Sequence, residues 1–222
     1  MKLMLDTANL EKIENYLKYL PVEGVTTNPS ILKKEGKIDL IRHMKEIRNL
    51  IGSDKSLHVQ VVSKDFEGII RDTNQILDTV GPETLIKIPA SKEGLRAIKE
   101  LKKNKVHITA TAIYSKIQAL LAMELEADYL ALYVNRMSNL NTDPYDVMET
   151  VSSQLRNVNS KSKILGASYK NIDQVIKTIE TGVSHVTVGS DVLDQFLLDP
   201  NIEKAVNDFA DDWYSVYEKF YI

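Results

Sequence analysis

Short apolar runs alternate with amphipathic stretches along the whole chain of 222 residues, and this alternation predicts an α/β fold. Strands that are separated by single helices need right-handed crossovers and therefore form a parallel sheet. About eight strand–helix units fit this length, which favours a compact (β/α)8 (TIM) barrel over an open doubly wound sheet. No GxGxxG motif follows the first predicted strand, so a dinucleotide-binding fold is disfavoured.

The expected elements follow one another without a long linker, a low-complexity tract or a shift in composition, so residues 1–222 are expected to form a single domain. The predicted strands are Leu3–Thr7, Gly24–Asn28, Leu57–Ser63, Leu85–Ala90, His107–Ile113, Tyr129–Asn135, Ile164–Ser168 and His185–Gly189. The predicted helices between them include Asn9–Leu20, Asp39–Ile51, Lys64–Val80, Lys92–Lys103, Ser115–Glu126 and Asn171–Thr181.

The segment Glu203–Tyr221 is expected to form an extra C-terminal helix. Its aromatic residues recur at three- and four-residue spacing and form one stripe, made of Phe209, Trp213, Tyr217 and Phe220. Two interpretations stay open on these residues alone. The stripe packs against the helices of its own barrel, or it contacts a second subunit, because aromatic residues are enriched at protein interfaces.

The composition excludes several kinds of partner. Lys and Arg number 28 against 31 Asp and Glu, so the net charge of −3 provides no basic field for nucleic acid or an anionic membrane. The chain has no Cys, which excludes disulfide and thiolate chemistry and favours a cytoplasmic location. Asp6 interrupts any signal-peptide core, and no apolar run approaches the roughly 20 residues of a membrane span. The scattered His residues lack metal-ligand spacing, so no metal is expected.

Side chains along a barrel strand alternate between the surrounding helices and the barrel interior. In Leu85–Ala90, the aliphatic pair Ile86 and Ile88 suits the helix side, which directs Lys87 into the barrel. The same reasoning directs Asp6, Gln60, Thr111, Tyr133, Asn135 and Ser168 inward from five other strands. Most of these residues lie near the carboxyl ends of the strands, where barrel active sites are found.

The seventh strand is assigned in the same way, with Leu165 and Ala167 expected to face the helices and Gly166 and Ser168 to face the interior. A strand register that is wrong by one residue would reverse such an assignment.

Lys87 is the most informative of the inward residues. Burial disfavours the charged ammonium and lowers the pKa, whereas an ordinary lysine amine with a pKa of about 10.4 is almost fully protonated at neutral pH. A neutral amine in a barrel mouth is suited to forming a Schiff base with a ketone. A buried ion pair between Lys87 and Asp6 is the competing interpretation, and strand alternation alone does not separate the two.

Each remaining polar residue also has an ordinary structural interpretation. Asp6 suits a helix cap, and Asn28 suits a cap followed by Pro29 at the first helical position. Gln60, Thr111 and Tyr133 suit hydrogen-bonded core positions, Arg136 suits the surface, and Ser168 suits the start of a loop. Their grouping around one buried lysine is what favours a functional site.

Several motifs occur in a fixed order that resembles one known family. They are Leu5-Asp6-Thr7, Gly24-Val25-Thr26-Thr27-Asn28-Pro29-Ser30, Ile86-Lys87-Ile88-Pro89, Tyr133-Val134-Asn135-Arg136 and Ala167-Ser168-Tyr169-Lys170. From Lys2 to Tyr221 the chain resembles the transaldolase family, small-subunit branch, and within it the fructose-6-phosphate aldolases most closely. The resemblance implies a (β/α)8 barrel, no metal or organic cofactor, and homo-oligomeric rings (a pentamer or decamer) in which the C-terminal helix reaches a neighbouring subunit.

The resemblance also implies a role for each site residue. Lys87 forms the Schiff base, and Tyr133 is the acid/base that works through a water held by Gln60 and Thr111. Asp6 and Asn28 contact substrate hydroxyls. Arg136 and Ser168 hold the phosphate of the aldehyde.

Three positions favour the aldolase branch, because transaldolases carry Glu, Phe and Asn where this chain has Gln60, Tyr133 and Thr109. Three other positions match neither branch: Glu126 stands where Gly is common, Leu132 replaces a Pro, and Gly189-Ser190 replaces a Pro-containing turn.

The expected activity is cleavage of fructose 6-phosphate between C3 and C4 to dihydroxyacetone and glyceraldehyde 3-phosphate. The alternatives are a transaldolase of the pentose phosphate pathway, which passes the dihydroxyacetone unit to an aldose phosphate, and a phosphosugar-binding barrel without catalysis. A Schiff-base aldolase of the deoxyribose-phosphate type is the weakest choice, because the block around Asn28 does not suit it.

Overall fold

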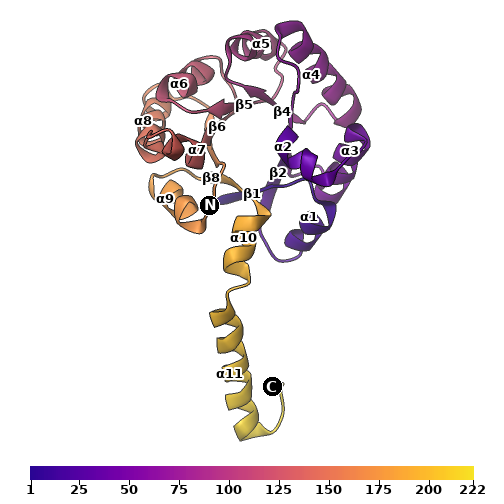
Figure 1. Ribbon diagram of the computed structural model, residues 1–222, viewed down its shortest axis with the longest axis vertical. Coiled ribbons are helices and arrows are strands. Elements are labelled where there is room, and N and C mark those ends of the chain that lie inside the picture. Colours follow the sequence, from indigo (N-terminus) through magenta and orange to yellow (C-terminus); the bar gives the residue numbers. More distant parts are fainter.

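A computed structural model describes residues 1–222 of the chain, apart from the side chain of residue 196. Eight parallel strands close into a barrel in the order β1 to β8, and helices surround it (Figure 1). The strands are β1 (Lys2–Asp6), β2 (Val22–Thr26), β3 (Ser56–Gln60), β4 (Leu85–Pro89), β5 (Ile108–Ile113), β6 (Tyr129–Tyr133), β7 (Lys163–Ala167) and β8 (His185–Val188). The predicted (β/α)8 barrel is confirmed.

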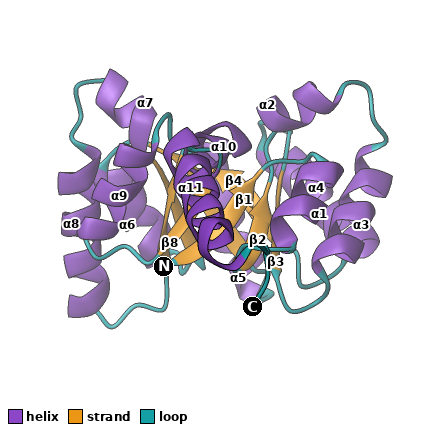
Figure 2. Cartoon of the chain, turned by 90° about the horizontal axis from the view of Figure 1, so that it is seen from below, coloured by secondary structure: helices purple, strands orange, loops and turns teal.

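The helices follow the strands in alternation. They are α1 (Leu10–Leu17), α2 (Pro29–Leu32), the 3-10 turn η1 (Lys33–Glu35), α3 (Leu40–Ile51), α4 (Phe66–Val80), α5 (Lys92–Lys103), α6 (Lys116–Glu124), α7 (Val134–Asn139), α8 (Pro144–Asn157), α9 (Ile172–Glu180), α10 (Ser190–Leu197) and α11 (Pro200–Tyr217). The short helices α2 and α7 lie at one end of the barrel and the start of β1 at the other (Figure 2).

Polar caps fix where several helices begin. The side chains of Asn9, Asp65 and Ser91 accept hydrogen bonds from backbone N–H groups in the first turns of α1, α4 and α5. Because Asn9 caps α1, the interpretation of Asp6 as a helix cap is wrong. Asn28 does cap α2, with Pro29 at the first helical position, as predicted.

The core has two layers. The larger layer joins the outer faces of the strands to the helices and contains Leu5, Val59, Ile86, Ile88 and Leu132. The smaller layer fills the barrel interior with Met4, Leu85, Tyr129, Ala131 and Leu165. The prediction that Ile86 and Ile88 face the helices, leaving Lys87 inside, is therefore confirmed for β4.

The assignment of β7 is wrong. Leu165 packs in the barrel interior. Gly166 faces the helices instead, because a Cβ built there would lie 2.0 Å from the Tyr169 hydroxyl and 2.8 Å from a Thr178 methyl. Ser168 still reaches the interior end of the barrel, but it does so through a left-handed backbone (φ 62°) after the strand has ended.

The C-terminal helix starts three residues earlier than expected and ends four residues earlier, at Tyr217. Glu218 takes a left-handed conformation that stops the helix, and the chain then turns so that Phe220 stacks on Tyr214 with ring centroids 4.6 Å apart. Figure 1 shows α11 leading away from the barrel, and none of its residues is buried. The interpretation in which the stripe packs against its own barrel is therefore wrong.

Two of the three unusual positions lie away from the mouth of the barrel. Leu132 packs in the helix-facing layer. Glu126 adopts a left-handed backbone (φ 59°), which explains why Gly suits this position. Gly189 differs, because it precedes α10 and lines the cavity described below.

Candidate active site

A cavity of about 370 Å³ opens at the carboxyl ends of the strands. Six of the eight predicted site residues line it: Asp6, Asn28, Lys87, Tyr133, Arg136 and Ser168. These residues come from β1, β4, β6, the start of α2, α7 and the turn after β7, so the fold gathers segments that are distant in sequence. A larger cavity of about 570 Å³ lies among the loops at the other end of the barrel, around Asp128 and Ser160, and holds none of the predicted residues.

Lys87 is almost completely buried, with 3% of its surface exposed, yet it borders the cavity. Burial lowers the pKa of its amine, and the nearby carboxylate of Asp6 acts in the opposite direction. A lowered pKa increases the fraction of neutral amine at physiological pH, and only the neutral amine is a nucleophile.

Asp6 does not form the ion pair with Lys87 that the sequence left open. None of the ion pairs within 4.0 Å in the described chain includes either side chain. Instead Asp6 Oδ1 accepts a hydrogen bond of 2.7 Å from Thr26, whose hydroxyl lies 2.6 Å from that of Thr187. Burial raises the pKa of Asp6, while the charge of Lys87 and the Thr26 hydrogen bond lower it.

Tyr133 and Thr111 form the second part of the site. Their hydroxyl oxygens lie 3.0 Å apart, and both residues are buried. Burial raises the pKa of Tyr133, so its hydroxyl keeps its proton at neutral pH. The pair therefore presents an acid that a neighbouring hydroxyl orients.

Gln60 is placed by pairing with the strand that carries the lysine. It is the register partner of Lys87 across β3 and β4, and its side-chain oxygen is buried without a hydrogen-bond partner in the described chain. Gln60 and Thr111 are absent from the surface of the cavity itself, although Thr111 reaches it through Tyr133. An unpaired buried carbonyl can accept a hydrogen bond from a bound molecule.

Arg136 lies at the mouth of the cavity and contacts two tyrosines. Its Nη1 donates to the Tyr114 hydroxyl at 3.0 Å, and its guanidinium stacks over the Tyr133 ring at 4.9 Å from the centroid. The strand β6 ends at Tyr133, so Arg136 projects from α7 and not from the extended strand predicted to run to Asn135. This placement orients one charged group beside the acid.

Sequence reasoning missed several residues that share the cavity. Lys34 and Lys170 add two cations, and Asp191 adds one carboxylate. Lys34 lies on η1, Lys170 in the loop after β7 and Asp191 on α10, so the alternation of side chains along strands does not reach them. The signal that could have found Lys170 is its place in the motif Ala167-Ser168-Tyr169-Lys170, directly after a strand.

Comparisons with known proteins identify the family of this chain. The model of the family described as transaldolase/fructose-6-phosphate aldolase matches residues 3–220. This chain belongs to that family. It is also 50% identical over 216 residues to a probable fructose-6-phosphate aldolase from Streptococcus pneumoniae (strain ATCC 700669 / Spain 23F-1). The aligned residues cover 97% of this chain and 97% of that relative. The protein is accordingly an enzyme of the aldolase/transaldolase type.

Two further observations concern other kinds of site. No helix in the described part of the chain combines the length and apolar character of a membrane span. The described residues also contain no group of three or more His, Cys, Asp and Glu side chains arranged to hold a metal ion.

Proposed function

We propose that this protein is a class I aldolase that cleaves fructose 6-phosphate into dihydroxyacetone and glyceraldehyde 3-phosphate through a Schiff base on Lys87. The observation that carries the proposal is the buried amine of Lys87 at the wall of a polar cavity that also contains the Tyr133 hydroxyl. Family membership supports the reaction class.

The reaction begins when the neutral amine of Lys87 attacks C2 of the ketose to give a carbinolamine. Loss of water then leaves a cationic iminium ion, which accepts the electrons of the C3–C4 bond. Removal of the proton from the C4 hydroxyl breaks that bond, so the aldehyde departs and an enamine remains on Lys87. Protonation of the enamine at C3 and addition of water release dihydroxyacetone and regenerate the amine.

Tyr133 is suited to the proton transfers because its hydroxyl is buried, protonated and held 3.0 Å from Thr111. Gln60 contributes a buried oxygen without a partner in the described chain. We assign Tyr133 the acid/base role, acting through a water that Gln60 and Thr111 hold.

The ends of the substrate are assigned by charge. Asp6, oriented by Thr26, and Asn28 hold hydroxyl groups near the reacting carbonyl. Arg136 and Ser168 hold the phosphate at the mouth of the cavity, where Lys34 and Lys170 add positive charge. No step requires a metal or an organic cofactor.

We further propose that α11 is a subunit contact in a homo-oligomer, a pentamer or decamer. The helix exposes apolar side chains, among them Val206 at 60%, Phe209 at 71% and Val216 at 69%. A helix that leads away from its own barrel leaves these groups in water unless a second copy covers them. The absence of Cys and the phosphorylated substrates suit a cytoplasmic location.

Incubation of the purified protein with fructose 6-phosphate alone tests the proposed reaction. We expect glyceraldehyde 3-phosphate and free dihydroxyacetone in equal amounts. Turnover that appears only after erythrose 4-phosphate is added would identify a transaldolase. No turnover under either condition would identify a binding protein.

A further inference from the structure

His58 is a buried histidine that the proposed reaction does not use. It has no exposed surface and points into the barrel from β3. Its strand position pairs with Leu85 of β4, two residues before Lys87, so its backbone lies one inward-facing layer below that of Lys87, farther from the carboxyl ends of the strands. A polar ring at this depth needs hydrogen-bond partners, because an unpaired buried polar group is costly.

Both ring nitrogens of His58 have partners. Nδ1 lies 2.8 Å from the hydroxyl of Thr109, and Nε2 lies 3.1 Å from the hydroxyl of Ser56. Thr109 is itself fully buried and is the register partner of Lys87 across β4 and β5. A continuous chain of polar groups therefore runs from Ser56 through His58 to the strand position beside Lys87.

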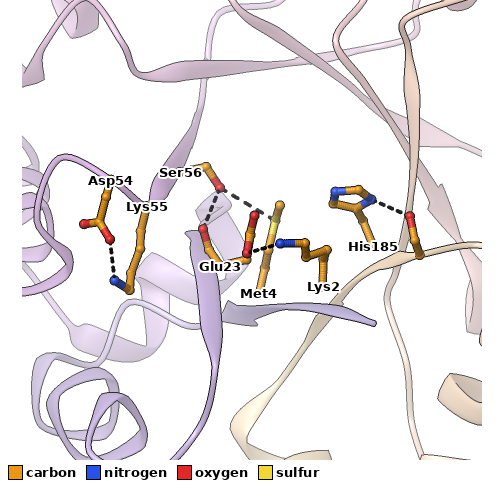
Figure 3. Close-up of polar contacts among 8 residues, drawn as sticks. Lys2, Met4, Glu23, Asp54, Lys55, Ser56 and His185 are labelled. Carbon is orange, nitrogen blue, oxygen red and sulfur yellow. Dashed lines mark hydrogen bonds and ion pairs between the residues drawn. The ribbon is translucent and has the colours of Figure 1, made fainter.

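Ser56 fixes the direction of this chain. Its hydroxyl donates toward the carbonyl oxygen of Glu23 at 3.4 Å, and the sulfur of Met4 is 4.0 Å away. Figure 3 shows both contacts as dashed lines from Ser56. We assign Nε2–H of His58 as the donor to Ser56, because the single proton of the Ser56 hydroxyl is then directed toward Glu23. Nδ1 then carries a lone pair and accepts the proton of Thr109, so the Thr109 oxygen offers only lone pairs to its surroundings.

The sequence makes room for this arrangement at Gly24. A Cβ on Gly24 would lie 2.1 Å from the Ser56 hydroxyl oxygen and 2.5 Å from its backbone oxygen. Any larger residue there would displace Ser56, so the lower end of the chain of hydrogen bonds depends on this glycine.

We propose that His58 is a positioning residue for the chemistry at Lys87. Its neutral ring orients the Thr109 hydroxyl so that the oxygen lone pairs of Thr109 point toward the cation that forms on the lysine. In this arrangement the negative end of the aligned His58 and Thr109 dipoles is the Thr109 oxygen, on the residue that pairs with Lys87 in the strand register. The two dipoles therefore favour the iminium ion, the intermediate on which bond cleavage depends. This inference rests on the proposed Schiff base at Lys87.

The ring must stay neutral for this role, and its surroundings enforce that state. Burial and the nearby positive charge of Lys87 hold the pKa of His58 well below its usual range. Arg48 of α3 and His185 of β8 act in the same direction. The rings of His58 and Tyr129 of β6 form a T-shaped pair with centroids 5.1 Å apart. Lys87 in turn faces the carboxylate of Asp6 from β1.

The test is the pH dependence of imine formation in the full-length protein. Dihydroxyacetone is added, the imine is trapped with cyanoborohydride, and the adduct on Lys87 is quantified by mass spectrometry from pH 5 to 10. Thr109→Val keeps the side-chain shape and removes the hydroxyl. We expect the rising limb of its profile to move to lower pH by roughly half a unit to one unit, because the ammonium loses one nearby favourable dipole.

Two further variants separate positioning from packing. His58→Phe should shift the limb in the same direction, and the double variant should shift it by less than the sum, because the two residues act as one unit. Thr109→Ser retains the hydroxyl and should restore the midpoint found with the unmodified chain. Thr73→Val is the matched control, since Thr73 is an equally buried threonine on the outer helix α4 and should leave the midpoint unchanged.

The outcomes distinguish this inference from the proposed function. An unmodified Lys87 in the unaltered protein would overturn the proposed Schiff base. A normal adduct whose pH midpoint is unchanged in Thr109→Val would overturn the role of His58. A midpoint shifted to higher pH would also overturn it, because such a shift requires the Thr109 proton to face the amine.

Discussion

Replacing Tyr133 by Phe should separate bond cleavage from Schiff-base formation. The change removes only the hydroxyl that lies 3.0 Å from Thr111 and keeps a buried ring, 9% exposed, against Arg136. Loss of a positioned acid/base typically slows a reaction by about 10²- to 10⁴-fold, so we expect a loss of that size in the cleavage rate. The amine of Lys87 is untouched, so the dihydroxyacetone imine should still form at equilibrium.

The same substitution has a predictable effect on stability. One buried hydrogen bond is lost and the Thr111 hydroxyl is left without its partner, which should lower the free energy of unfolding by about 1–3 kcal/mol. Thr111→Val in the same chain removes the orphaned hydroxyl as well. Most of the lost stability should then return.

Two assays on the same samples decide this prediction. Cleavage of fructose 6-phosphate is followed by the aldehyde released, and the equilibrium imine is measured as the adduct reduced by borohydride. Tyr16→Phe is the matched control, because Tyr16 is a buried tyrosine of α1 outside the cavity that pairs its hydroxyl with Asp194, and it should leave both readouts unchanged. Equal losses of cleavage and adduct in Tyr133→Phe, or full cleavage activity, would refute the assigned acid/base role.

Four further outcomes are expected. Lys87→Met should abolish cleavage. It should also raise the melting temperature, because an apolar side chain of similar length replaces a buried amine. A lower melting temperature would contradict the cost assigned to burying that amine. The pKa of Lys87 is lower in the folded protein than in the unfolded chain, so the unfolded chain binds the proton more tightly. The free energy of unfolding, measured in urea, should therefore rise with pH toward the ordinary lysine pKa of 10.5. This rise should be weaker in Lys87→Met. Phe209→Asp should release smaller species in size-exclusion chromatography while the barrel stays folded by circular dichroism, and an unchanged elution volume would argue against α11 as a contact. Glu126→Gly should raise the free energy of unfolding by up to about 1 kcal/mol, since Glu126 has a φ of 59°.

The fold and the central lysine could be predicted because their signals are local and repeated. Alternation along each strand needs only the sequence, and the flanking Ile86 and Ile88 identify the inward face at Lys87. Strand alternation does not identify the inward face of β7, because a barrel strand is buried on both faces and Leu165 suits the interior as well as the helix side. Gly166 faces outward for a reason that the strand does not contain, namely the approach of the Tyr169 hydroxyl.

The remaining parts of the site depend on contacts between distant segments. Ser168 enters the cavity through a left-handed turn, and Arg136 projects from a short helix that begins directly after Tyr133. Lys34 and Asp191 belong to helical turns whose position over the barrel is set by packing. The link from His58 to Thr109 joins β3 to β5 across the interior, and no spacing in the sequence indicates it.

Reduction by borohydride in the presence of dihydroxyacetone, followed by peptide mapping, tests the central idea most directly. We expect a single stable adduct on the peptide that contains residue 87, and none in the Lys87→Met variant. A protein that cleaves the sugar phosphate while this peptide stays unmodified, or that is labelled at another lysine, would contradict it.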